Sequence, residues 1–139
     1  MRFKQAALSE CEIRYGVQGQ GPALVCLHPS SGVRITPALE ELMRTSTVYL
    51  PTIPGFDGTA LPKASLTVTQ LGKWMGEFID LVIGTKVNLS GHSFGGWVAS
   101  WVAVLRPDIV ERLVLQCPIG FRPQTPPKPD ADPDRKSVV

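Results

Sequence analysis

Apolar and polar positions along the chain predict several short strands. The run Ala23–Leu27 is continuously apolar, which is typical of a strand covered on both faces of a sheet. A glycine-rich turn, 16–22, precedes it and follows a predicted antiparallel hairpin. The other predicted strands are Phe3–Leu8, Cys11–Tyr15, Thr47–Leu50, Val87–Leu89 and Val110–Leu115.

Other stretches carry the spacing of helices. From about Thr67, apolar residues recur on one stripe of an amphipathic helix that ends near Gly84. Trp74 falls off this stripe, so we expect it at the rim of the helix. Residues Phe94–Leu105 are mostly apolar and predict a buried helix, and a further helix is expected near Thr36–Arg44.

Strands that alternate with helices predict an α/β protein with a mainly parallel sheet and flanking helices. We expect residues 1–120 to form one core domain. Residues 121–139 are rich in proline and charge and show no periodicity, which predicts a disordered tail or an unfinished connection to a further segment.

Composition narrows the class of protein. Of 139 residues, 43% are hydrophobic, and 14 basic against 12 acidic residues give no reason to expect a nucleic-acid partner. No apolar run has the length of a membrane span, and the N-terminus lacks the core of a signal peptide. The 3 cysteines have no metal-ligand spacing, so we expect a cytoplasmic protein without a metal, cofactor or disulfide framework.

One pentapeptide has the pattern of a catalytic serine. Gly91-His92-Ser93-Phe94-Gly95 fits G-x-S-x-G, with a predicted strand before it and a predicted helix after it. This context is that of a nucleophile elbow, in which a tight turn lifts the serine hydroxyl clear of the sheet. Side chains at Gly91 and Gly95 would collide with neighbouring backbone, and Gly96 lets the helix start close to the strand. The alternative is a glycine-rich turn with an incidental serine.

The start of the following helix is suited to hold an oxyanion, because its free N–H groups and its dipole favour negative charge. The N–H of Phe94 is one expected donor. A second donor is expected from the loop after the strand 23–27. Pro29 has no N–H, so we assign this role to Ser30.

Four segments in order resemble the N-terminal portion of an α/β-hydrolase: GQGPALVCLHPSSG, LPTIPGFDG, LSGHSFGGWVAS and LRPDIVERLVLQCPIG. The resemblance covers nearly all of residues 3–120. It implies the strand order 1-2-4-3-5-6, a serine nucleophile at Ser93, and a role for His28 in shaping the oxyanion loop. Serine at the elbow implies hydrolysis of an ester, thioester, amide or C–C bond, and residues 121–139 would begin the family's lid segment. Pro29 stands where glycine usually follows the histidine.

The base that would activate Ser93 is missing. In this family an acid and then a histidine follow the serine, yet both histidines of the chain, His28 and His92, precede it. His92 is expected to project away from the serine, and His28 as the base is a minor alternative. The later acids lie at a helix end, at a strand start or in the proline-rich tail.

Two hypotheses remain. In the first, the chain derives from a serine hydrolase that acts on a small acyl substrate and is inactive or weakly active by itself. In the second, it is a hydrolase-like binding domain or an inactive fragment. In either case the strand 110–115 becomes an exposed edge through which copies of the chain can associate. Substrate identity depends on segments that this sequence does not contain.

Overall fold

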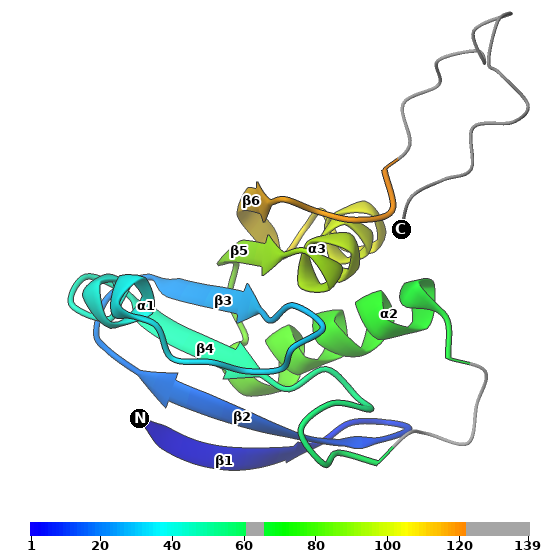
Figure 1. Cartoon of the computed structure of the whole chain (residues 1–139), viewed down its shortest axis with the longest axis horizontal. Coiled ribbons are helices and arrows are strands. Elements are labelled where there is room, and N and C mark those ends of the chain that lie inside the picture. Colours follow the sequence, from blue (N-terminus) through cyan, green and yellow to red (C-terminus); the bar gives the residue numbers. More distant parts are fainter. Residues whose placement is uncertain (61–65, 122–139) are drawn as a thin grey trace, which may run out of the picture.

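A mixed sheet forms the centre of the molecule (Figure 1). The computed structural model describes residues 1–60 and 66–121. The sheet has 6 strands in the order β1-β2-β4-β3-β5-β6, which confirms the order expected from the resemblance. The strands are β1 (Arg2–Ala7), β2 (Glu12–Gln18), β3 (Ala23–Leu27), β4 (Thr47–Pro51), β5 (Val87–His92) and β6 (Val110–Gln116); the helices are α1 (Pro37–Leu42), α2 (Val68–Phe78) and α3 (Phe94–Leu105), with the π-helical turn η1 (Ile79–Ile83) continuing α2.

Strand pairing brings the ends of β3 and β5 together. β1 and β2 form the predicted antiparallel hairpin, and β2 also pairs antiparallel with β4. The pairs β4–β3, β3–β5 and β5–β6 are parallel. Leu27, the last residue of β3, lies opposite Gly91 of β5. The loop after β3 and the turn after β5 therefore leave the sheet side by side.

The main core lies between the sheet and the helices α2 and α3, which pack against each other (Figure 1). Side chains alternate between the two faces of a strand, so every second residue of β3 and β5 points into this core. Val25, Leu89, Phe78 and Val98 have no exposed surface there. The continuous apolar run of β3 is thus explained by burial on one face and partial cover on the other.

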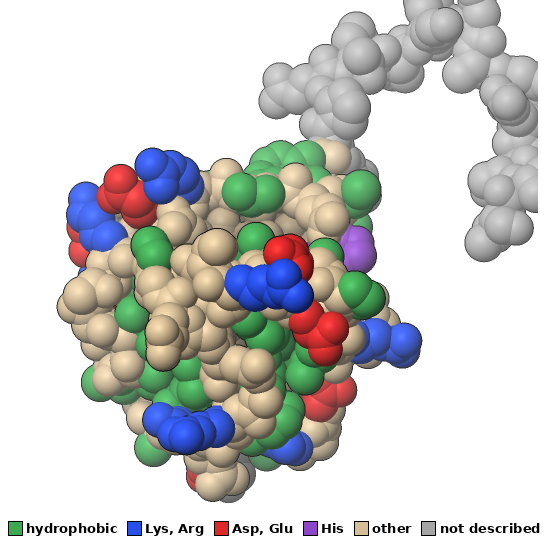
Figure 2. All heavy atoms as spheres, turned by 90° about the vertical axis from the view of Figure 1, so that its left-hand side faces the viewer, with side chains coloured by type: hydrophobic (Ala, Val, Ile, Leu, Met, Phe, Trp, Pro, Cys, Tyr) green, Lys and Arg blue, Asp and Glu red, His purple; other side chains and the backbone are tan. Residues whose placement is uncertain are grey.

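The opposite face of the sheet is only partly covered. Met43, just after α1, packs with Val48 and Leu50 of β4 in a small second cluster. Beyond that cluster lies a groove of about 610 Å³ between α1 and β6, which we call the α1-side groove. Its lining includes Cys26 and Val114, and Val114 is 59% exposed. Figure 2 shows one face of the molecule, where basic, acidic and hydrophobic side chains are interspersed.

Two predictions from the sequence are corrected. Trp74 is only 1% exposed and lies in the main core, not at the helix rim. The tip of the β1–β2 hairpin covers it, and its indole Nε1–H donates to Glu10 at 3.0 Å. The strand expected to stop at Tyr15 continues to Gln18, because residues 15–18 pair with β4.

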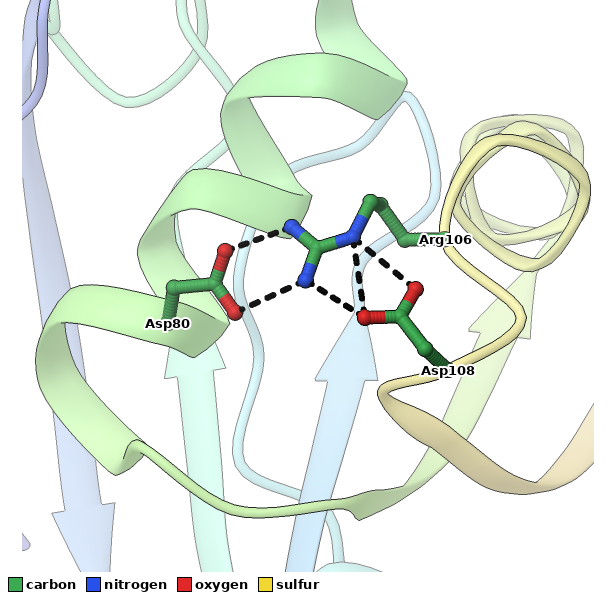
Figure 3. A network of polar contacts seen from close by, with 3 residues as sticks. All are labelled: Asp80, Arg106 and Asp108. Atoms are coloured by element: carbon green, nitrogen blue, oxygen red, sulfur yellow. Dashed lines mark hydrogen bonds and ion pairs between the residues drawn. The ribbon is translucent and has the colours of Figure 1, made fainter.

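An ion-pair network fastens the end of α3 to η1 (Figure 3). The guanidinium of Arg106 lies between the carboxylates of Asp80 and Asp108, and its Nη2 is 2.8 Å from Asp108 Oδ2. The hydrogen bond from Arg106 holds the pKa of Asp108 below its usual value. The network joins the two helical elements at the protein surface.

The expected domain 1–120 spans nearly all described residues. The segment 121–139, which was expected to be a disordered tail or an unfinished connection, lies outside the described residues except for Phe121. No helix among the described residues is long and apolar enough to cross a membrane. The expected cytoplasmic location stays a prediction.

Candidate active site

Ser93 occupies a strained backbone conformation between β5 and α3. Its φ is 51° and its ψ is −112°, in a region that L residues rarely adopt and that costs about 1–3 kcal/mol. Three hydrogen bonds hold the residue there. Its N–H donates to the Gln116 carbonyl at 2.9 Å, and its carbonyl accepts from the N–H groups of Trp97 and Ile119. The end of β6 and the segment after it therefore lock the turn.

Glycines on both sides of Ser93 are required by close contacts. A Cβ atom at Gly95 would lie 2.3 Å from the Leu27 carbonyl oxygen, and one at Gly91 would lie 2.4 Å from the Gly95 oxygen. A Cβ at Gly96 would lie 2.9 Å from Pro118. Real Cβ atoms do not approach backbone this closely, so no larger residue fits at positions 91 and 95 without a shift of the chain. The turn thus has the geometry that a nucleophile elbow needs.

The loop after β3 lies beside this turn. The Gly32 N–H donates to the Pro29 carbonyl at 3.0 Å, which closes a β-turn with Ser30 and Ser31 at its tip. Both serines are exposed. Among the described residues, the N–H groups of Ser30 and Phe94 make no hydrogen bond, so each is free to donate to a ligand.

His28 has both ring nitrogens engaged. Nε2 accepts the N–H of Ile53 at 2.9 Å, so the proton resides on Nδ1, which lies 2.7 Å from the Pro29 carbonyl. Burial lowers the pKa of the ring, while the Pro29 carbonyl and the charge of Asp57 oppose that shift. A neutral imidazole with no free nitrogen is unsuited to activate Ser93. This geometry favours the role in shaping the loop.

His92 points into the α1-side groove. It alternates with Gly91 along β5 and lines the groove together with Ser90 and Gln116. No hydrogen bond joins its ring to Ser93 within the described residues. The described part of the chain therefore carries the serine and free N–H groups but no base beside them.

Aromatic contacts connect the loops around the site. The ring of Phe56, in the segment after β4, lies 5.1 Å from the His28 ring and 5.4 Å from the Phe94 ring, measured between centroids. Phe94 in turn lies 6.4 Å from Trp97. No local sequence pattern predicts these contacts of Phe56. Its position between two loops depends on tertiary packing.

Asp57 has a contact that the sequence did not reveal. Its Oδ2 accepts the N–H of Val33 at 2.8 Å, across 24 residues of chain. Its φ of 47° is typical of an aspartate in a turn. No local pattern predicts which distant N–H such a side chain meets.

Three features together are typical of α/β proteins with a nucleophile elbow: a mainly parallel sheet, a strained serine at the carboxyl end of a central strand, and a helix that begins directly after it. The model of the alpha/beta hydrolase family matches residues 24–138. The chain belongs to this family.

Several curated proteins are similar in sequence. An abhydrolase domain-containing protein of Caenorhabditis elegans, abhd-5.2, is 34% identical over 93 residues, which are 64% of this chain and 21% of that protein. The pimeloyl-[acyl-carrier protein] methyl ester esterase of Aeromonas salmonicida is 33% identical over 98 residues, 69% of this chain and 37% of the esterase. The chain thus spans well under half the length of these relatives.

Solved structures share the fold. A hydrolase from Pseudomonas aeruginosa superposes with a TM-score of 0.75 at 25% identity, covering 81% of this chain and 44% of that one. An alpha/beta hydrolase fold protein from Burkholderia ambifaria gives a TM-score of 0.74 at 22% identity, covering 89% of this chain and 47% of the other.

Proposed function

We propose that the chain is the nucleophile-bearing part of a serine hydrolase that acts on a carboxylic ester or related acyl substrate. The observation that carries this proposal is the strained backbone of Ser93, held by three hydrogen bonds between glycines that admit no side chain. Strain of this kind persists only where the surrounding structure enforces it, and it is concentrated at functional sites. The similarity to a methyl ester esterase supports the substrate class.

In the proposed reaction, Ser93 Oγ attacks the carbonyl carbon of the substrate while a base accepts the hydroxyl proton. The carbonyl oxygen becomes an oxyanion, which the N–H groups of Phe94 and Ser30 stabilise. The tetrahedral intermediate collapses, the alcohol leaves with a proton, and an acyl-enzyme remains on Ser93. Water, deprotonated by the same base, then releases the acid and restores the hydroxyl.

The base and its acid partner are proposed to come from the part of the hydrolase fold that follows the elbow in this family. Neither His28 nor His92 is placed to serve. By itself, the chain of residues 1–139 is expected to hydrolyse p-nitrophenyl esters slowly or not at all.

A fluorophosphonate probe tests this proposal. The chain is mixed with a polypeptide that carries the C-terminal part of an α/β-hydrolase, and adducts are mapped by mass spectrometry. We expect an adduct on Ser93 that disappears in Ser93→Ala and persists in Ser90→Ala. Ser90 is the matched control because it lies on β5, three residues before Ser93, and faces the α1-side groove. An adduct that Ser93→Ala leaves unchanged, or no adduct at all, rejects the proposal.

The second candidate is a hydrolase-like domain that binds a ligand or partner without catalysis. The engagement of both His28 nitrogens and the position of His92 favour it for this chain alone. The same mixture separates the two candidates. Absence of a Ser93 adduct, together with no turnover of any ester in the reconstituted assembly, favours the binding domain.

We also propose that copies of the chain associate through β6. This strand lies at one edge of the sheet, with Leu113 and Val114 exposed by 38% and 59%. An unprotected edge offers free N–H and C=O groups to another strand. Light scattering after size-exclusion chromatography is expected to show dimers or larger species, which Val114→Lys reduces. A monomer at every protein concentration would overturn the proposed association through β6.

A further inference from the structure

Two loops at the carboxyl edge of the sheet are tied together at two points. The first loop, residues 28–33, follows β3, and the second, residues 52–58, follows β4. At one end, the Ile53 N–H donates to His28 Nε2 at 2.9 Å. At the other end, the Val33 N–H donates to Asp57 Oδ2 at 2.8 Å. The first loop is therefore clamped at its first and last residues.

The carboxylate of Asp57 is held close to the first loop. A Cβ atom at Gly32 would lie 2.4 Å from Asp57 Oδ1, so only glycine lets the carboxylate approach the backbone here. The second loop is itself closed by hydrogen bonds from the Phe56 N–H to the Ile53 carbonyl and from Thr59 to the Phe56 carbonyl. Asp57 thus reaches across from an ordered turn.

Between the two ties lies the tip with Ser30, whose N–H is the proposed second oxyanion donor. Donors stabilise a transition state most when they are already oriented and need no reorganisation during the reaction. A loop clamped only at His28 would leave the tip free to rotate about one end. The tie from Asp57 to Val33 fixes the other end, directly after the β-turn closed by Gly32 and Pro29.

We propose that Asp57 is a positioning residue that holds the oxyanion loop in register with Ser93. The inference rests on the proposed function. Asp57 touches no reacting atom in this role and acts through the Val33 N–H and the backbone of Gly32. Its loss is expected to slow formation of the tetrahedral oxyanion without changing how strongly the probe first binds.

Two substitutions separate the carboxylate from the backbone conformation. Asp57 has a positive φ of 47°, so alanine would add strain as well as remove the acceptor. Asp57→Gly relieves the strain and removes the acceptor. Asp57→Asn tolerates the same φ and keeps an acceptor oxygen for Val33. If Asp57 acts through its hydrogen bond, the asparagine variant behaves as wild type and the glycine variant does not.

The first measurement is amide hydrogen exchange of Val33 in the full chain, followed by NMR. We expect exchange roughly tenfold or more faster in Asp57→Gly and close to wild type in Asp57→Asn, since the lost bond was the protecting one. Equal protection of Val33 in all three proteins rejects the tie itself, whatever the outcome at Ser93.

The second measurement is the rate of Ser93 phosphonylation by a fluorophosphonate in the reconstituted assembly, as a function of probe concentration. We expect the maximal rate constant to fall roughly tenfold in Asp57→Gly, with an unchanged half-saturating concentration and recovery in Asp57→Asn. Wild-type rates in Asp57→Gly overturn this inference and leave the proposed function intact. Absence of labelling in the wild type rejects the proposed function, and with it the role of Asp57 in the reaction.

Discussion

The two faces of the sheet differ in how completely they are covered. On the face toward α2 and α3, Val25 and Leu89 have no exposed surface, and the helices pack closely. On the other face, α1 is a helix of 6 residues that covers only part of the sheet, and Val114 remains 59% exposed. The same strands β3, β5 and β6 form both faces.

The difference shows which face of the sheet supplies the contacts that fix the turn at Ser93. Ser93 begins the helix that covers the closed face, and its turn is fixed by contacts with β3 and β6. The histidine next to it points to the open face, into the α1-side groove. A parallel sheet is stable when both faces are covered. The proposed nucleophile is therefore positioned by contacts on the covered half of the fold, and we propose that the catalytic base comes from the part of the fold that follows the elbow in this family.

The largest effect is expected from Gly95→Ala. Its Cβ would lie 2.3 Å from the Leu27 carbonyl oxygen and 2.5 Å from the His28 carbonyl oxygen, and these are backbone atoms that cannot move aside like the end of a side chain. We expect a loss of about 3 kcal/mol or more in the free energy of unfolding, measured by urea denaturation. Gly76→Ala is the matched control, because the nearest atom to its Cβ would be 3.5 Å away. That variant is expected to gain about 0.5–1 kcal/mol from helix propensity.

A matched pair of valines compares the two faces directly. Val25→Ala, on the covered face of β3, is expected to lower the free energy of unfolding by about 2–3 kcal/mol, because it removes buried methyl groups and leaves a cavity. Val114→Ala, on the open face of β6, is expected to change it by less than about 0.5 kcal/mol. Equal losses in chemical denaturation would contradict the difference between the faces.

His28 predicts a pH dependence of stability. Burial lowers its pKa below the ordinary value of 6.5, so between the two values the unfolded chain binds a proton that the folded chain does not. The stabilisation that comes from this pKa difference is fully present above pH 6.5. It is lost as the pH falls toward the folded pKa, and the free energy of unfolding then decreases by at most about 1.4 kcal/mol per pH unit. Thermal melts of wild type and the control His92→Gln should share this loss, and His28→Gln should lack it.

The smallest effect is expected from Arg106→Ala. The side chains of Arg106, Asp80 and Asp108 are 35%, 44% and 62% exposed, so water and salt screen the network in Figure 3. We expect a small decrease in Tm that shrinks further at high salt. A large, salt-independent decrease would show that Arg106 does more than join the ends of two helical elements.

Local patterns were sufficient to predict much of the fold. The apolar run of β3, the helix after Ser93 and the stop at Gly84 follow from periodicity and glycine chemistry, and the structure agrees with them. Trp74 was misplaced because its burial depends on the hairpin tip, which is distant in sequence. The same reason applies at the site. The glycines around Ser93 are local signals, whereas the tie between Asp57 and Val33 joins loops 24 residues apart.

The most direct test is a crystal structure of the fluorophosphonate adduct in the reconstituted assembly. The phosphonyl oxygen of this adduct stands where the oxyanion forms. We predict that it lies on Ser93 and accepts hydrogen bonds from the N–H groups of Phe94 and Ser30, with residue 93 keeping its positive φ. An adduct whose oxygen points into solvent, or a Ser93 with ordinary helical or extended backbone angles, would contradict the account.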